Sequence, residues 1–280
     1  MIKVCSLSSG SNGNAIFIKT GADCFLVDAG VSCKQICLRL QQIESHISHV
    51  KGIFITHEHS DHVRGLDVLL RKHPTPVYLT EETYKNMPIT IADGLLHFIG
   101  PNDRVVIDET VIQSLPKSHD AVEPLLFCFY YKGKKISVIT DAGYGCDNVI
   151  AALRESHIVF LESNYDEEML RSGFYPPYLK KRIAGPSGHL SNVTAGSLIR
   201  DHASPYLEYV FLSHLSENNN TPRLALETFL SIVKERDELK NMDTILTSRY
   251  AVSKVVEIQV LTGDEVPGPA ETLAFSPPFI

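Results

Sequence analysis

The chain has 280 residues, of which 44% are hydrophobic and 21% are charged, and its formal net charge is −7. This balance excludes a disordered chain and counts against a broad basic face for nucleic acid, although a local one is compatible with it. No run approaches the roughly 20 apolar residues that span a bilayer, and six scattered cysteines without a CxxC pair indicate reduced thiols rather than disulfides or a thiolate zinc site.

The start of the chain is expected to form a β-hairpin. Residues 1–6 lack the layout of a secretion signal, which predicts a cytoplasmic protein with no membrane partner. Strand patterns at 2–7 and 15–18 flank residues 8–14, a loop rich in glycine, serine and asparagine. That loop could expose N–H groups to an anion, but it lacks the lysine of a P-loop, so a hairpin turn is the favoured interpretation.

Residues 56–62 hold three histidines and an aspartate directly after an apolar strand pattern, and this density of ligand-type side chains predicts a metal site. His57, His59 and Asp61 alternate, so in an extended segment their side chains leave from one side. His62 breaks the alternation and projects beside Asp61 if a helix begins there. A catalytic ion commonly takes three protein ligands, so four ligands in one segment predict two ions that share it. The alternative is a solvated polar loop that contains histidines by chance.

Later strands also end on ligand-type residues. His119, Asp141 and His214 each follow a predicted strand, and together they supply two further imidazoles and a carboxylate that could bridge two ions. Two more carboxylates stand at strand ends. Asp28 is expected to orient a metal-bound histidine, and Glu162 is expected to support the site.

The remaining elements are predicted from periodicity and capping residues. Candidate N-caps mark the starts of three helices, at Ser32, at Ser191 or Asn192, and at Thr221. A further helix is predicted from 63 to 72, and strand patterns between 95 and 139 indicate a second sheet. No linker divides the chain, so residues 1–280 are expected to form a single domain with an irregular tail from about 262. A basic run at 180–182 is interpreted as a solvated face, although it lies near a candidate active-site motif in the sequence.

Taken together, these residues resemble the metallo-β-lactamase superfamily over most of the chain. The resemblance implies an α/β fold, a four-layer αββα sandwich of two mixed β-sheets flanked by helices, with a dinuclear site along one edge. It implies one ion held by His57, His59 and His119, a second held by Asp61, His62 and His214, and a bridge formed by Asp141. An acidic bridge, where the true lactamases use a cysteine, points to the hydrolases and phosphodiesterases.

Narrower motifs resemble one branch of this superfamily, the YycJ (WalJ)-like proteins, and they lie at residues 7–14, 162–164, 188–192 and 211–216. The resemblance implies a 5′-to-3′ DNA exonuclease in bacterial mismatch repair, with DNA as substrate and repair proteins as candidate partners. His189 stands where tRNA 3′-processing members carry an active-site histidine in a His-Ser-Thr motif, although Leu190 intervenes here before Ser191. In that position His189 could contact the scissile phosphate or protonate the departing oxygen.

The expected chemistry is hydrolysis at two cations. They would lower the pKa of a bridging water and neutralise phosphate charge, while Asp61 could orient the resulting hydroxide. Imidazole and carboxylate ligands suit zinc, manganese or iron(II), so the sequence leaves the metal open, as it does the oligomeric state.

Two alternatives remain at this point. The first is a small-molecule hydrolase of the same fold, acting on a thioester or a cyclic phosphodiester, which the acidic net charge favours. The second is a metal-stabilised module that binds DNA or repair proteins without turnover. A basic groove beside the ions would favour nucleic acid, and a closed apolar pocket would favour a small molecule.

Overall fold

The computed structural model describes residues 1–260, and the tail predicted to begin at about 262 lies outside the described residues. The described residues form two seven-stranded sheets. The first sheet contains β1 (Ile2–Ser8), β2 (Ala15–Thr20), β3 (Asp23–Val27), β4 (Val50–Phe54), β5 (Val77–Leu79), β6 (Leu96–Phe98) and β14 (Val256–Ile258). The second contains β7 (Arg104–Ile107), β8 (Thr110–Pro116), β9 (Leu125–Tyr131), β10 (Lys134–Ile139), β11 (Ile158–Glu162), β12 (Tyr209–Ser213) and β13 (Asp243–Leu246).

Both sheets mix antiparallel and parallel pairs. In the first sheet β1, β2 and β3 pair antiparallel, which confirms the predicted hairpin, whereas β3 to β6 pair parallel. In the second sheet β7 to β10 pair antiparallel and β10 to β13 pair parallel. β14 returns from the end of the described chain to pair antiparallel with β1. Each sheet therefore has a parallel part, in which neighbouring strands end at the same edge.

The two sheets pack face to face through an aromatic core. Phe25 of β3 contacts Phe129 of β9, with ring centroids 5.7 Å apart. Phe54 of β4 contacts both Phe127 and Phe129, at 5.4 and 5.5 Å. All four rings are fully buried, and each contributes about 2 kcal/mol through removal of its apolar surface from water. Because this core draws on both sheets, neither sheet covers its inner face alone.

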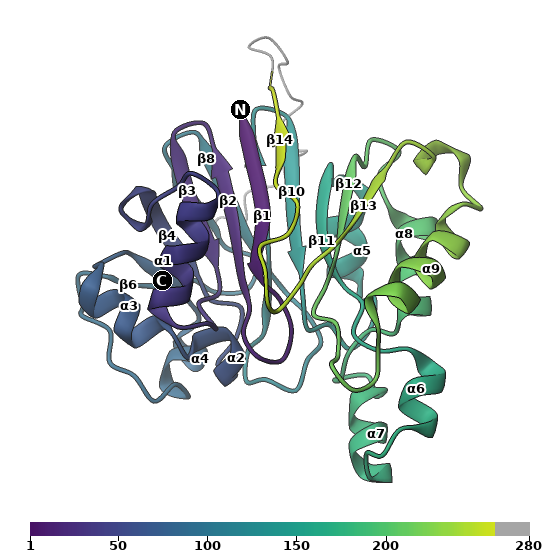
Figure 1. Cartoon of the computed structure of the whole chain (residues 1–280). Helices are drawn as coiled ribbons and strands as arrows, with labels where there is room; N and C mark the ends of the chain where they lie inside the picture. Colours follow the sequence, from purple (N-terminus) through teal and green to yellow (C-terminus); the bar gives the residue numbers. More distant parts are fainter. Residues whose placement is uncertain (261–280) are drawn as a thin grey trace, which may run out of the picture.

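Helices cover the outer faces of the two sheets, as Figure 1 shows. The first half of the chain contributes α1 (Cys33–Gln42), η1 (Ile47–His49), α2 (Ser60–Val63), α3 (Leu66–Lys72) and α4 (Glu81–Lys85). The second half contributes α5 (Asp147–Arg154), α6 (Glu167–Ser172), α7 (Pro177–Ile183), α8 (Asn192–His202), α9 (Pro222–Val233) and η2 (Asp237–Leu239). This arrangement confirms the predicted αββα sandwich. Among the described helices, none has the length and apolar character needed to cross a membrane.

The predicted helix starts are confirmed by their caps. The side chain of Ser32 accepts a hydrogen bond from the N–H of Gln35, and that of Ser191 accepts one from Thr194. Thr221 caps α9 in the same way. Each cap satisfies one of the N–H groups that a helix leaves unpaired in its first turn.

Three features differ from the predictions. The pattern from residue 95 onward predicts a second sheet, but β6 pairs with β5 in the first sheet, so that prediction is wrong for residues 96–98. A strand of three residues carries too little pattern to reveal its partner. The helix predicted from 63 to 72 is interrupted at Gly65, where a Cβ would meet the carbonyl oxygen of Val31 at 1.9 Å. Finally, the sequence patterns did not predict the helices α4, α5, α6 and α7, the short helices η1 and η2, or the strands β13 and β14.

Candidate metal centre

The predicted metal ligands follow the ends of strands from both sheets. In the second sheet β8, β10 and β12 are followed by His119, Asp141 and His214, and in the first sheet β4 is followed by His57. β10 and β12 run in the same direction, and β8 shares it because two antiparallel pairings separate β8 from β10. Their carboxyl ends therefore meet at one edge of the sandwich, where α2 also begins.

The first group of converging ring nitrogens belongs to three histidines. Nε2 of His57 lies 3.0 Å from Nδ1 of His59, and Nε2 of His119 lies 3.3 Å from the same atom. Burial lowers the pKa of His57 well below its ordinary value and that of His119 to about 4. Both imidazoles are therefore neutral at pH 7, the state in which a histidine binds a metal ion.

A second group joins Asp61 to two further histidines. Oδ2 of Asp61 lies 3.5 Å from Nε2 of His62 and 3.5 Å from Nε2 of His214. Burial acts to lower the pKa of His62, but the neighbouring carboxylates, that of Asp28 most strongly, outweigh it and raise this pKa to about 10. The surrounding carboxylates thus favour a positive charge at this position, which a bound cation would also supply.

Asp141 lies between the two groups. Its Oδ2 is 3.2 Å from Nε2 of His62, and its Oδ1 is 3.9 Å from Nε2 of His119. Burial acts to raise the pKa of Asp141, but the imidazoles of His214 and His62 hold it well below its ordinary value. The carboxylate is therefore ionised and reaches both groups, which is the position that a bridging ligand would occupy. All seven predicted ligands are brought together at this edge.

The residues at the centre fit divalent cations. Oδ2 of Asp141 and Nε2 of His214 are buried, and although His62 and Asp61 lie within 3.5 Å of them, neither atom makes a hydrogen bond of good geometry within residues 1–260. Leaving a buried polar atom unpaired costs about 1–3 kcal/mol, and coordination to a metal would remove that cost. The backbone is also strained here, because Asp28, Asp141 and His214 adopt φ values of 65°, 52° and 56°. Such strain, about 1–3 kcal/mol per residue, clusters at functional sites.

Asp28 and Thr56 orient the predicted ligands His57 and His62 through hydrogen bonds to the ring nitrogens that face away from the centre. The Nδ1–H of His62 donates to Oδ2 of Asp28 at 2.7 Å, which leaves Nε2 directed into the centre. The hydroxyl of Thr56 donates to the same carboxylate and lies 2.9 Å from Nδ1 of His57. The role predicted for Asp28 is thus matched by the geometry, since hydrogen bonds of this kind fix the tautomer and ring orientation of metal-binding histidines.

Glu162 performs the same task for the other half of the centre and also holds His189. Oε1 of Glu162 lies 2.8 Å from Nδ1 of His214 and 2.8 Å from Nδ1 of His189. Its Oε2 accepts the backbone N–H groups of Ala142 and Leu190 at 2.9 and 3.0 Å. Burial acts to raise the pKa of Glu162, but His189 and His214 lower it to about 2. The sequence predicted a supporting residue here, but not one that links His189 to a metal ligand.

His189 lies on the open side of the centre. Its ring centroid is 5.2 Å from that of His119 and 5.3 Å from that of His214. Its side chain is 21% exposed, whereas that of Glu162 behind it is fully buried. His189 is therefore the imidazole of this cluster that a substrate can reach once the others hold cations.

The β1–β2 loop lies against the ligands, which the hairpin interpretation of the sequence did not anticipate. Nδ2 of Asn14 is 3.3 Å from Oδ2 of Asp61 and 3.1 Å from Nε2 of His62. The hydroxyl of Ser9 accepts the backbone N–H of His214 at 2.7 Å. The loop thus joins the two halves of the centre. The glycine and asparagine content of the loop indicated that it could have a role, but nothing in the sequence indicated which residues it contacts.

A separate cluster lies outside the centre. Ligand-type atoms of Cys33, Cys37 and His73 lie within 4.8 Å of one another. The sequence contained this possibility only as two cysteines four residues apart, because His73 comes from the end of a different helix. Burial raises the pKa of Cys37, which favours the protonated thiol over the thiolate that binds metal.

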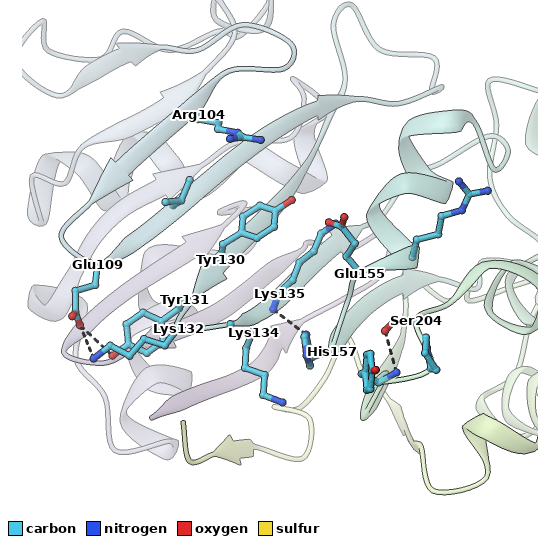
Figure 2. A pocket seen from close by; sticks show the side chains of 15 residues that line it. Arg104, Glu109, Tyr130, Tyr131, Lys132, Lys134, Lys135, Glu155, His157 and Ser204 are labelled. Atoms are coloured by element: carbon cyan, nitrogen blue, oxygen red, sulfur yellow. Dashed lines mark hydrogen bonds and ion pairs between the residues drawn. The ribbon is translucent and has the colours of Figure 1, made fainter. Parts of the chain in front are cut away.

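The structure also contains a cavity of about 560 Å³ far from the centre, shown in Figure 2. Its lining includes Tyr130 of β9, Lys132 in the turn after β9, and Lys134 at the start of β10. Because β10 runs from this turn toward Asp141, the cavity and the candidate centre lie at opposite ends of the second sheet. The amines of Lys132 and Lys134 are paired with Glu109 and Glu208.

Comparison with known proteins gives concordant matches. A family model described as the metallo-beta-lactamase superfamily matches residues 9–214. The chain is 36% identical over 241 residues to exodeoxyribonuclease YycJ of Bacillus anthracis, covering 82% of this chain and 88% of the relative. It is 33% identical over 240 residues to exodeoxyribonuclease WalJ of Streptococcus pneumoniae, covering 84% and 89%. The solved structure of the metallo-beta-lactamase fold protein YhfI of Bacillus subtilis matches with a TM-score of 0.71 at 13% identity, over 91% of this chain and 98% of that one.

Proposed function

Because this chain belongs to the metallo-β-lactamase superfamily, we propose that it is a dinuclear metal-dependent phosphodiesterase that degrades DNA as an exonuclease. The proposal is carried by one observation, the convergence of ligand-type histidines and carboxylates around Asp141. The fold and the two exodeoxyribonuclease relatives support a hydrolase that acts on phosphodiester bonds. Their identities confirm the resemblance to the YycJ (WalJ)-like proteins.

The proposed ligands divide between two divalent ions, zinc, manganese or iron. The first ion would be held by His57, His59 and His119, the second by Asp61, His62 and His214, and Asp141 would bridge them. When bound, the two ions would supply a nucleophile by lowering the pKa of a water to near neutrality and would neutralise phosphate charge.

Two residues of the chain would act on the substrate directly. Because Nδ1 of His189 is held by Glu162, its Nε2 is left to contact a phosphate oxygen or to give a proton to the departing oxygen. Asp61, whose Oδ2 lies between His62 and His214, would accept a hydrogen bond from the attacking water and orient it.

The finer parts of the proposal come from the motifs of the sequence and the resemblance that they carry. We include in it cleavage in the 5′-to-3′ direction, a role in DNA repair with repair proteins as partners, and a cytoplasmic location. We also propose that residues 1–280 act as one hydrolase domain, because the aromatic core is shared by both halves of the described chain.

The nuclease proposal predicts that DNA cleavage depends on the ligands in α2. Asp61→Ala and His62→Ala should each lower the rate on the order of 10²-fold or more, since loss of a residue that merely supports a ligand already costs 10- to 100-fold. The assay is digestion of end-labelled duplex with zinc, manganese or iron(II) supplied. Exposed His49 lies outside the centre, so His49→Ala is the matched control and should cleave normally. Absence of mutation-sensitive cleavage with every metal would refute the proposal.

The same assay reads the direction of cleavage. A 5′-to-3′ exonuclease releases a 5′ label at once as a short product, whereas a 3′ label passes through a ladder of shortening fragments. The reverse pattern would contradict the proposed direction while leaving the nuclease in place.

A small-molecule hydrolase is the second candidate, and the net charge of −7 favours it. A thioester or a cyclic phosphodiester would then be the substrate. Efficient turnover of such a compound by a protein that leaves DNA intact would replace the first proposal with this one. The exodeoxyribonuclease relatives favour an enzyme over a binding module without turnover.

A further inference from the structure

Helices α6 and α7 project from the sandwich at the end where α2 also lies, as Figure 1 shows. Within the described structure, none of the seven residues of α7 is buried. Phe174, between the two helices, is 80% exposed, and Tyr178 in α7 is 75% exposed. Neighbouring exposed aromatic rings on a projecting segment stabilise no core, so their presence indicates a binding surface.

The same segment carries consecutive cations at Lys180, Lys181 and Arg182. The amine of Lys180 donates to the carbonyl oxygen of Arg171 at 2.8 Å, and Arg182 pairs with Asp120. Lys181 is exposed, and it has no ion pair with any residue from 1 to 260. Lys181 is therefore the cation of this run that is available to an incoming anion.

Three contacts hold α7 and the loop after it against the loops of the candidate centre. Arg182 pairs with Asp120, the residue after the predicted ligand His119. The N–H of His189 donates to the carbonyl oxygen of Ile183 at the end of α7, at 2.9 Å. The hydroxyl of Ser118 donates to the carbonyl oxygen of Pro186 at 2.5 Å. The exposed rings and Lys181 are thus held at a fixed place beside the proposed catalytic histidine.

A recess lies between this segment and Asp120, the residue that follows the predicted ligand His119. It has a volume of about 350 Å³ and is lined by Asp120, Tyr178, Lys181, Arg182, Gly185, Pro186 and Ser187. Its lining thus combines an aromatic ring, Tyr178, with the cations Lys181 and Arg182. Aromatic rings stack on nucleic-acid bases of any sequence, and cations pair with the phosphates. Proteins bind single-stranded nucleic acids with this combination of side chains.

We propose that Phe174, Tyr178 and Lys181 form a strand-binding surface that holds single-stranded DNA beside the metal centre. The inference rests on the proposed nuclease function and adds the residues that hold its substrate. Tyr178 and Phe174 stack on bases, and Lys181 pairs with a phosphate. The contact through Arg182 and Asp120 sets the distance between the gripped strand and His189.

The test measures binding apart from cleavage. A fluorescein-labelled single-stranded 12-mer is titrated with full-length protein in EDTA, and anisotropy gives the Kd. Tyr178→Ala together with Lys181→Ala should raise the Kd about tenfold or more, because stacking of one base alone is worth that much. Loss of one phosphate contact should also reduce the slope of log Kd against log salt by about 0.7. Tyr178→Phe keeps the ring and should bind as the unaltered protein does.

Matched controls come from the cavity in Figure 2, at the other end of the second sheet. Tyr206, which is 72% exposed, and Lys132 both line that cavity. Tyr206→Ala together with Lys132→Ala should therefore leave the Kd unchanged. The proposed surface would be refuted by an unchanged Kd in the Tyr178 and Lys181 variant, or by an equal rise of the Kd in the control variant. An unaltered protein that does not bind the 12-mer would refute it as well.

Cleavage assays separate this inference from the proposed function. If the unaltered protein binds the 12-mer through this surface but cleaves no DNA with any metal, the nuclease proposal fails and the surface stands. With an active enzyme, the Tyr178 and Lys181 variant should raise KM for the 12-mer and leave turnover of bis(p-nitrophenyl) phosphate unchanged. An equal loss of both activities would mean that α7 only positions His189, which would contradict strand binding.

Discussion

Single residues of the candidate centre differ in how far they could be predicted. The predicted metal ligands form an inner set that the sequence reveals, and the residues that contact those ligands form an outer set that it reveals less well. The metal-binding residue types could be recognised because His57, His59 and Asp61 occur at close spacing, a pattern with few structural explanations. Glu162 and Asn14 could not be assigned their contacts, because those contacts join segments that lie 27 to 52 residues apart in the chain. Only folding shows which acid supports which histidine.

Glu162 offers the sharpest test of the outer set. Glu162→Gln keeps the shape but removes the charge and turns one acceptor into a donor. We expect activity to fall 10- to 100-fold and the free energy of unfolding to fall by about 1–3 kcal/mol. The rate of DNA cleavage and the unfolding midpoint in urea measure the two effects, and elemental analysis gives the metal content. Wild-type metal content, activity and stability would remove Glu162 from the centre.

The same residue gives a dependence on pH. The pKa of Glu162 is about 2 in the folded protein, below its ordinary value of 4.5. Its charge therefore stabilises the fold above pH 4.5, and this contribution is lost as the pH falls toward 2. Urea unfolding between pH 6 and 3 should show a steeper loss of stability in the unaltered protein than in Glu162→Gln. Parallel curves would contradict this assignment.

The cysteine cluster tests the number of metals. Cys33, Cys37 and His73 supply three donors where a structural zinc site uses four, so we expect no ion there. Cys33→Ser with Cys37→Ser should leave the metal content of the protein at the value of the unaltered chain. A loss of one ion per chain, or a thiolate-to-cobalt absorption band that disappears in the variant, would prove this expectation wrong.

At the scale of elements, the predictions succeeded where a local chemical signal exists. Ser32, Ser191 and Thr221 could be identified as helix starts because a cap is a contact within one turn. The helices α6 and α7 went unpredicted for the opposite reason. They bury little apolar surface, so they lack the period that marks an amphipathic helix. β6 was assigned to the wrong sheet because strand pairing depends on segments that the local pattern does not contain.

Gly30 shows how tightly three segments meet behind the ligands. The N–H of Gly30 donates to the carbonyl of Asn14, and the N–H of Asn14 donates to that of Asp61. A Cβ on Gly30 would lie 1.6 Å from the carbonyl oxygen of Asp61. Gly30→Ala should therefore displace α2, lower metal affinity and reduce stability by several kcal/mol. Gly94, where a Cβ would meet no atom of the described structure within 4 Å, provides the control. Equal melting temperatures and metal affinities for the two variants would contradict the packing argument.

At the scale of the whole molecule, the fold class could be predicted because the ligand motifs carry family information that local patterns do not. The centre lies where the two sheets meet, with His57 from one and His214 from the other. Bound metal should therefore tie the sheets together. This dependence follows from topology and not from any one contact.

Metal removal tests that coupling. An ion that binds only the folded chain adds about 2.7 kcal/mol of stability when present at 100 times its Kd. EDTA should lower the melting temperature of the purified protein, and readdition of zinc or manganese should restore it. His62→Ala with Asp61→Ala removes two proposed ligands of the second ion only, so EDTA should lower the melting temperature of this variant by less than that of the unaltered protein. An unaltered protein that is indifferent to EDTA would argue against a centre shared by the two sheets.

The pairing of β14 with β1 joins two strands that are synthesised at different times. Val256–Ile258, the outer neighbour of Ile2–Ser8, is synthesised some 250 residues after it. Until then β1 presents an unpaired edge of the kind that recruits strands from other chains. His214 is also synthesised late, so the nascent chain lacks this residue of the candidate centre during most of its synthesis. Slow or interrupted translation should therefore lead to aggregation through the first sheet rather than to a smaller active enzyme.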